Sequence, residues 1–180
     1  MPDVMTPEQL KAAVACGMLA FPLTDFDAND AFDPKASVRR LEWLAGHHPA
    51  ALFVAGGAGE FFSLTPAEYA TGVDTAVRTC GGRVPVIAAA GYGTRTAIEY
   101  VQEAERRGAD GLLLLPPYLT EGSQEGLRAH VAAVCRSTRL PVIVYNRANC
   151  RLTADTATRL AQDCANLIGF KDGVGDIEQL

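Results

Sequence analysis

The chain has 180 residues, enough for one domain with a sizeable core. Hydrophobic residues make up 48% of it and charged residues 21%, which excludes an intrinsically disordered chain. The net charge of −5 argues against nucleic acid as a partner and against a polybasic membrane-binding surface. No apolar run approaches the ~18 residues of a membrane span, so we expect no membrane partner either.

The N-terminal region and the cysteines indicate a cytoplasmic protein. The apolar run at residues 12–21 comes nearest to a signal peptide, but acidic Asp3 and Glu8 precede it where basic residues would stand. The five cysteines have irregular spacing and form no C-x-x-C motif. This pattern is typical of reduced thiols, most of which we expect to be buried.

Six short apolar runs recur along the chain and predict strands. Each run is nearly continuous rather than alternating, as in parallel strands that are buried on both faces. The predicted strands cover residues 17–21, 51–55, 84–90, 111–115, 141–146 and 167–171.

Helical segments precede the first run and separate the others. The clearest start is Thr65-Pro66-Ala67-Glu68, a capping box with proline at the first helical position. The clearest end is Arg106-Arg107-Gly108, a cationic last turn followed by a glycine. Further helices are predicted over residues 6–16, from 33 through 44, from 94 to 107, over 123–137 and over 153–164.

This alternation of strand and helix is that of a repeated βα unit, and two architectures fit it. One is a doubly wound open sheet and the other is a (β/α)8 TIM barrel. The first strand runs into residues 21–25, Phe-Pro-Leu-Thr-Asp, without the glycine-rich loop of a doubly wound nucleotide binder. The TIM barrel is therefore favoured. Because it needs eight strands, we expect residues 1–180 to be a single, incomplete TIM-barrel domain with about six βα units.

Two reactive side chains stand at the ends of the last two predicted strands. Lys171 ends an apolar strand, whose neighbours desolvate the amine and favour its neutral, nucleophilic form. Tyr145 ends the preceding strand and could act as a proton shuttle. Sequential barrel strands are neighbours, so both groups could share a site on the catalytic face of the barrel. The structural alternatives stay open: a lysine that reaches solvent or pairs with Asp172, and an aromatic residue at a strand rim.

A glycine-rich segment, Gly56-Gly57-Ala58-Gly59-Glu60, follows the second predicted strand. Its backbone N–H groups could bind an anion, although a tight βα turn explains the pattern as well. It is not the G-x-G-x-x-G fingerprint, and no P-loop, G-x-S-x-G or H-E-x-x-H motif occurs. A run of Asp and Asn at residues 25–29 begins like a calcium loop but lacks its later ligands, so no metal site is predicted.

Three of these segments together resemble a known family. The glycine segment at 56–60, Tyr145-Asn146 and Lys171-Asp172-Gly173 are similar to motifs of the dihydrodipicolinate synthase / N-acetylneuraminate lyase superfamily. The resemblance is collinear from about residue 18 to the end of the chain. Within the superfamily, residues 53–64 and 169–176 look closest to the 5-dehydro-4-deoxyglucarate dehydratase branch.

The resemblance implies a role for each matching residue. Lys171 would form an imine with a 2-oxo acid, Tyr145 would relay protons, and Gly57, Ala58 and Gly59 would hold the carboxylate beside the keto group. No metal or organic cofactor would be needed. Relatives of this kind are usually homo-oligomers, so we expect one here.

The chain also departs from the synthase branch of the superfamily. That branch has hydroxyl residues where Gly57 and Ala58 stand, a second relay tyrosine where Leu119 stands, and a carboxylate-binding arginine where Cys150 stands. These differences count against dihydrodipicolinate synthesis. Nearby polar candidates for the far end of a sugar-acid substrate are Arg147 and Asn149.

The implied reaction is dehydration and decarboxylation of 5-dehydro-4-deoxy-D-glucarate to 2,5-dioxopentanoate, water and CO2, which makes the expected enzyme a hydro-lyase. Two alternatives remain. A 2-oxo acid aldolase of the same superfamily would use the same lysine to break a C–C bond, and a non-catalytic α/β module would only bind a small molecule.

Overall fold

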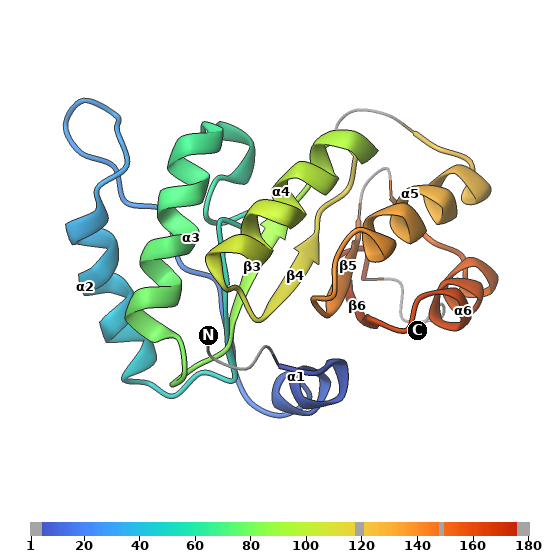
Figure 1. Ribbon diagram of the computed structural model, residues 1–180, viewed down its shortest axis with the longest axis horizontal. Coiled ribbons are helices and arrows are strands. Elements are labelled where there is room, and N and C mark those ends of the chain that lie inside the picture. The colour runs from blue at the N-terminus through green and yellow to red at the C-terminus, as the bar shows by residue number, and fades with distance from the viewer. Residues whose placement is uncertain (1–4, 118–120, 148–149, 176–180) are drawn as a thin grey trace.

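The computed structural model describes residues 5–117, 121–147 and 150–175, and within them six parallel strands form one curled sheet (Figure 1). The strand order is β1-β2-β3-β4-β5-β6, and every neighbouring pair is parallel. The strands are β1 (Leu19–Ala20), β2 (Ala51–Val54), β3 (Val86–Ala90), β4 (Gly111–Leu114), β5 (Val142–Asn146) and β6 (Leu167–Asp172).

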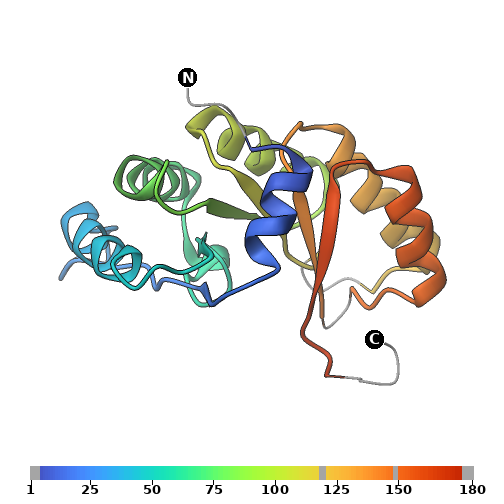
Figure 2. The same cartoon turned by 90° about the horizontal axis from the view of Figure 1, so that it is seen from below.

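This sequential order decides between the two predicted architectures. A doubly wound sheet reverses direction at a switch point, whereas barrel strands follow one another around the circle. The helices α2 to α6 cover the outer side of the sheet one after another (Figures 1 and 2). The helices are α1 (Pro7–Val14), α2 (Pro34–Ala45), α3 (Pro66–Cys80), α4 (Thr94–Arg107), α5 (Gln124–Arg136) and α6 (Ala154–Asp163). The TIM-barrel prediction is confirmed for six βα units.

The predicted helix starts are mostly confirmed in atomic detail. Thr65 and Glu68 form the expected capping box of α3. Ser123 caps α5 and Thr153 caps α6 through side-chain oxygens, as serine and threonine do before a first helical turn. α4 begins at Thr94 as predicted, after Gly93 as its N-cap, and the Thr94 hydroxyl lies 2.9 Å from Nδ1 of His130. A short 3₁₀ helix, η1 (Phe61–Ser63), was not predicted.

The core extends along the middle strands and is closed at one end by α1. Every residue of β2, β3 and β4 is buried, which explains why their sequences are continuously apolar. Figure 2 shows α1 beside the strands when the molecule is seen from below. Its Leu10 side chain is fully buried and fills the space beside Gly111, where a Cβ would come within 2.4 Å of Leu10 Cδ2. The helix α1 therefore covers one end of the core inside the curled sheet.

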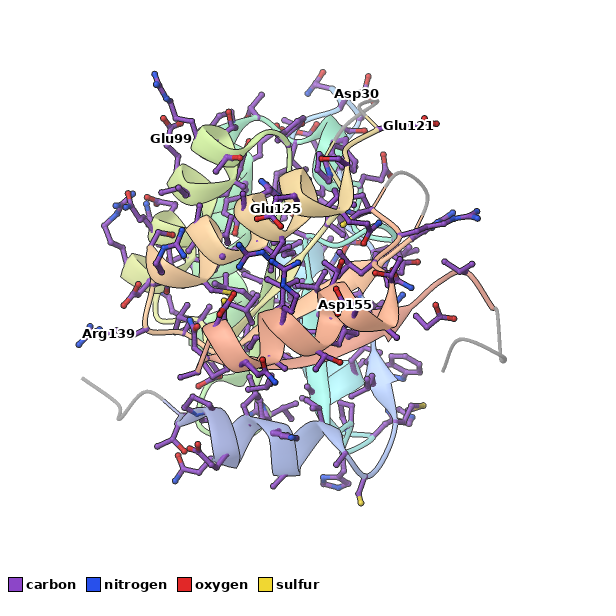
Figure 3. All side chains as sticks on the ribbon, turned by 90° about the vertical axis from the view of Figure 1, so that its right-hand side faces the viewer. Asp30, Glu99, Glu121, Glu125, Arg139 and Asp155 are labelled. Atoms are coloured by element: carbon purple, nitrogen blue, oxygen red, sulfur yellow. The ribbon has the colours of Figure 1, made fainter. Side chains whose placement is uncertain are left out.

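Charged side chains occupy the outer helix surface. Figure 3 looks at α5 and α6, with Glu125 and Asp155 labelled. Arg159 Nη2 lies 3.2 Å from Glu125 Oε2, and Arg128 forms an ion pair with Asp163, so both ion pairs join the two helices. None of the described helices has the length and apolar character that would be needed to cross a bilayer.

The cysteines follow the prediction closely. Cys80, Cys135, Cys150 and Cys164 are buried and Cys16 is exposed, and all five thiols are free. Burial raises the pKa of the Cys150 thiol to about 11, so at neutral pH it is a protonated, apolar group.

The burial of His130 predicts that the stability of the fold depends on pH. His130 on α5 is buried, its Nε2 has no hydrogen-bond partner among the described residues, and burial lowers its pKa below the 6.5 of a free histidine. Below pH 6.5 the unfolded chain therefore binds a proton that the folded chain refuses. Above pH 6.5, His130 should therefore add no pH dependence to the free energy of unfolding. Below pH 6.5, this free energy should fall as the pH drops, by at most about 1.4 kcal/mol per pH unit.

The measurement is the free energy of unfolding between pH 8 and pH 5. His130→Gln should flatten the slope in this range relative to the unsubstituted protein. Equal slopes for the His130→Gln variant and the unsubstituted protein would contradict the assignment.

Candidate active site

Tyr145 and Lys171 lie side by side at the carboxyl ends of β5 and β6. Their Cα atoms are register partners, and so are those of Asn146 and Asp172. Leu167 pairs with Val142 but Gly169 pairs with Ile143, so β6 contains one extra residue at this point. This irregularity brings Lys171 level with Tyr145, since three steps along β5 match four steps along β6.

The Lys171 amine lies against aromatic rings. Its Nζ atom is 3.6 Å from the centroid of the Tyr145 ring and 5.4 Å from that of Phe21. Phe21 stacks on Phe53 of β2 with ring centroids 4.7 Å apart. Phe21 thus links the second strand to the sixth. Around the half-buried Lys171 amine, aromatic rings take the place of some of the water that surrounds a surface lysine.

One structural alternative for Lys171, an ion pair with Asp172, is absent from the described structure. The Asp172 carboxylate accepts hydrogen bonds from the N–H groups of Gly175 at 2.8 Å and Val174 at 3.2 Å, which lower its pKa. The Asp172 carboxylate is therefore hydrogen-bonded within the turn that follows it, and the Lys171 amine lies beside the Tyr145 ring.

The Tyr145 hydroxyl is polarised by its neighbours. Arg147 Nη1 donates a hydrogen bond to it at 3.2 Å. Burial is the largest single influence and raises the pKa of Tyr145, but the polar contacts and positive charges of Lys171 and Arg147 together outweigh it and lower the pKa below 10. A phenol with a lowered pKa gives up and takes back a proton more readily near neutral pH.

Asn146 joins the ends of the two strands. Its Nδ2 donates to Asp172 Oδ1 at 3.3 Å, and its Oδ1 accepts from the Leu152 N–H at 2.9 Å. Its backbone carbonyl accepts from the Gly173 N–H at 2.9 Å. The residues that follow Tyr145 and Lys171 are therefore held together, which fixes the two reactive side chains relative to each other.

The glycine segment forms a compact turn after β2. Ala55 and Glu60 at its two ends both have positive φ values, of 50° and 57°. Gly57 and Ala58 are exposed at its tip, and among the described residues their N–H groups donate to no acceptor. Gly59 is buried, and its carbonyl accepts a 2.6 Å hydrogen bond from the Thr24 hydroxyl. The tip can bind an anion, while Gly59 holds the turn in place.

Two glycines of this turn should differ in how strongly alanine substitution destabilises the protein. A Cβ at Gly59 would lie 3.1 Å from the N and Cα atoms of Ala55, whereas a Cβ at Gly57 would meet nothing within 4 Å. We expect Gly59→Ala to destabilise the protein by about 1–3 kcal/mol, because the backbone must move. Gly57→Ala, the matched control, should stay within about 0.5 kcal/mol. Chemical denaturation of both variants measures this difference, and equal unfolding free energies would contradict it.

The structure brings only some of the predicted site residues together. It brings Lys171, Tyr145 and Arg147 together, while Asn149 lies outside the described residues. Sequence reasoning missed the contact of the amine with Phe21, and it gave no role to Gly173, where an added Cβ would lie 2.6 Å from Cε2 of Tyr145. In the described ranges no three His, Cys, Asp or Glu side chains gather as metal ligands would.

Comparison with protein families shows to which family the chain belongs. The model of the dihydrodipicolinate synthetase family matches residues 15–180. The chain belongs to this family. Curated family members extend the match: a probable 5-dehydro-4-deoxyglucarate dehydratase from Leptothrix cholodnii is 60% identical over 174 residues. Its counterparts from Pseudomonas entomophila and Azotobacter vinelandii are each 58% identical over 174 residues.

These matches cover 97% of this chain and 57% of each relative. The chain therefore spans a little over half the length of the curated relatives that it matches.

Solved structures of the family have the same fold. Dihydrodipicolinate synthase from Aquifex aeolicus aligns with a TM-score of 0.86 and 29% identity, over 91% of this chain and 57% of the other. The chloride-inhibited synthase from Acinetobacter baumannii, complexed with pyruvate, aligns with a TM-score of 0.85 and 32% identity over the same shares. The six strands thus match part of a family barrel.

Proposed function

We propose that the protein is a Schiff-base dehydratase that converts 5-dehydro-4-deoxy-D-glucarate to 2,5-dioxopentanoate, water and CO2. The observation that carries the proposal is the contact between Lys171 and Tyr145, in which an amine lies 3.6 Å from the centre of a phenol ring whose pKa is lowered. Curated relatives at 58–60% identity have the name of this dehydratase.

The proposed reaction begins with attack of the Lys171 amine on the C5 keto group of the substrate, which loses water and leaves a protonated imine. The imine withdraws electrons from C4, so that a C4 proton becomes acidic. Its removal drives out the C3 hydroxyl, which leaves as water. Tyr145 is the group beside the imine that can shuttle these protons.

The same imine serves the second half of the reaction. Once C3 and C4 share a double bond conjugated with the imine, the electrons of the C1–C2 bond can move into this system as CO2 departs. Reprotonation on carbon and hydrolysis of the imine release 2,5-dioxopentanoate and restore the Lys171 amine. One electron sink thus supports both the dehydration and the decarboxylation, and the proposal requires neither a metal nor an organic cofactor.

We assign the substrate contacts by chemistry. The free N–H groups of Gly57 and Ala58 suit the carboxylate next to the keto group, with Gly59 supporting the turn that presents them. Arg147 is exposed beside Tyr145 and suits the distant carboxylate. Asn149 is kept as a second candidate for this end of the substrate.

We propose that the enzyme is cytoplasmic and does not bind nucleic acid. Five free cysteines suit the reducing cytoplasm, and the net charge of −5 does not suit nucleic acid. A homo-oligomer is proposed from the family resemblance alone.

Product analysis separates the proposed dehydratase from the alternatives. Incubation with 5-dehydro-4-deoxyglucarate should release CO2 and 2,5-dioxopentanoate in equal amounts. Formation of pyruvate would instead indicate the aldolase, because the C–C bond next to the pyruvyl fragment would then have broken. Binding of the substrate without any product would indicate the non-catalytic module.

A further inference from the structure

We propose that Gly173 is a positioning residue for Tyr145: its lack of a side chain leaves the space in which the edge of the Tyr145 ring sits. A Cβ built on Gly173 would lie 2.6 Å from Cε2, 3.0 Å from the hydroxyl oxygen and 3.1 Å from Cζ of Tyr145. Carbon atoms in contact are normally about 3.5–4.0 Å apart, so the ring would have to move by roughly 1 Å.

The backbone cannot easily give way instead of the ring. The Gly173 N–H donates to the Asn146 carbonyl at 2.9 Å, and the preceding carboxylate of Asp172 accepts from Gly175 and Val174. Gly173 is thus held between a strand pairing on one side and a tight turn on the other. An added methyl group would therefore push mainly on Tyr145.

Three residues surround the Tyr145 ring. Lys171 Nζ lies over its face, Gly173 lies at its edge, and Arg147 donates to its hydroxyl. Displacement of the edge would change the direction of the hydroxyl relative to the amine. Gly173 thus acts through Tyr145, and this role rests on the proposed function only in so far as Tyr145 relays protons.

Two readouts test the role, one of them independent of turnover. In protein labelled with ¹³C at tyrosine Cζ, the Tyr145 resonance, assigned by its loss in Tyr145→Phe, should shift in Gly173→Ala and titrate at a higher pH. Imine formation with 5-dehydro-4-deoxyglucarate, measured by borohydride trapping, should slow at least tenfold in Gly173→Ala. It should show no further slowing when Gly173→Ala is added to Tyr145→Phe.

Gly72→Ala is the matched control, because a Cβ there makes only ordinary 3.9 Å contacts with Phe32. A Tyr145 titration and a trapping rate in Gly173→Ala equal to those of this control would overturn the proposal. Absence of trapping in the unsubstituted protein, with the titration still shifted by Gly173→Ala, would support the positioning role and contradict the proposed function.

Thermal melting covers the case in which Gly173→Ala does not fold. Removal of the ring in Gly173→Ala/Tyr145→Ala should restore the melting temperature of Tyr145→Ala, since the methyl group then has room. If Gly173→Ala lowers the melting temperature equally with and without the ring, or if the double variant also fails to fold, the proposal is wrong.

Discussion

Lys171→Arg is expected to abolish imine formation and to lower turnover by at least about 10³-fold, while the fold is retained. Arginine keeps the positive charge beside the Tyr145 and Phe21 rings, but a guanidinium stays protonated near neutral pH and cannot attack a carbonyl. Because Lys171 is half-buried at a strand end, the longer side chain can be accommodated. Turnover and the mass gained after borohydride treatment with substrate are the quantities to measure.

The chain offers two matched controls for this substitution. It contains only three lysines, and the other two, Lys11 and Lys35, are exposed on α1 and α2. Lys11→Arg and Lys35→Arg should leave turnover and trapping unchanged. A stable substrate-derived mass on the Lys171→Arg protein would show that another group forms the covalent bond.

Tyr145→Phe is expected to leave substrate binding nearly intact and to lower kcat by about 10²–10⁴-fold. The ring that contacts Lys171 remains, so packing is preserved, but the hydroxyl that Arg147 contacts is lost. The effect should therefore appear in kcat and not in KM. Steady-state kinetics with 5-dehydro-4-deoxyglucarate measures both.

Tyr92→Phe controls for the general loss of a phenol. Tyr92 follows β3, and its hydroxyl donates to the Phe62 carbonyl at 3.3 Å and not to a group of the Lys171–Tyr145 pair. It should change kcat by less than about twofold. A reduction of less than about threefold in Tyr145→Phe would make Tyr145 a packing residue and would leave the proton relay without a group.

The sequence predicted the sheet well because its signals are local. Continuous apolar runs marked all six strands, and caps such as Thr65 and Ser123 marked helix starts within a residue or two. Strand lengths were overestimated where buried loop residues continue an apolar run, as before β3, where Val84 is buried but the strand begins only at Val86. Burial, and not pairing, made those residues apolar.

The site was predicted only in part, because some of its contacts are not local. The extra residue in β6 that aligns Lys171 with Tyr145 depends on pairing with β5, which no pattern within one strand reveals. Phe21 lies far from Lys171 in the sequence and meets it only because the sheet curls. Gly173 was visible in the motif, yet its contact with the Tyr145 ring depends on three-dimensional packing.

Peptide mapping of the borohydride-reduced protein after incubation with 5-dehydro-4-deoxyglucarate identifies the lysine that forms the imine. The small number of lysines makes the result unambiguous, since Lys11, Lys35 and Lys171 fall far apart in the sequence. We expect a substrate-derived mass on the peptide that contains Lys171 and on no other lysine peptide. The same mass on Lys11 or Lys35, or no covalent mass while substrate is being consumed, would contradict it.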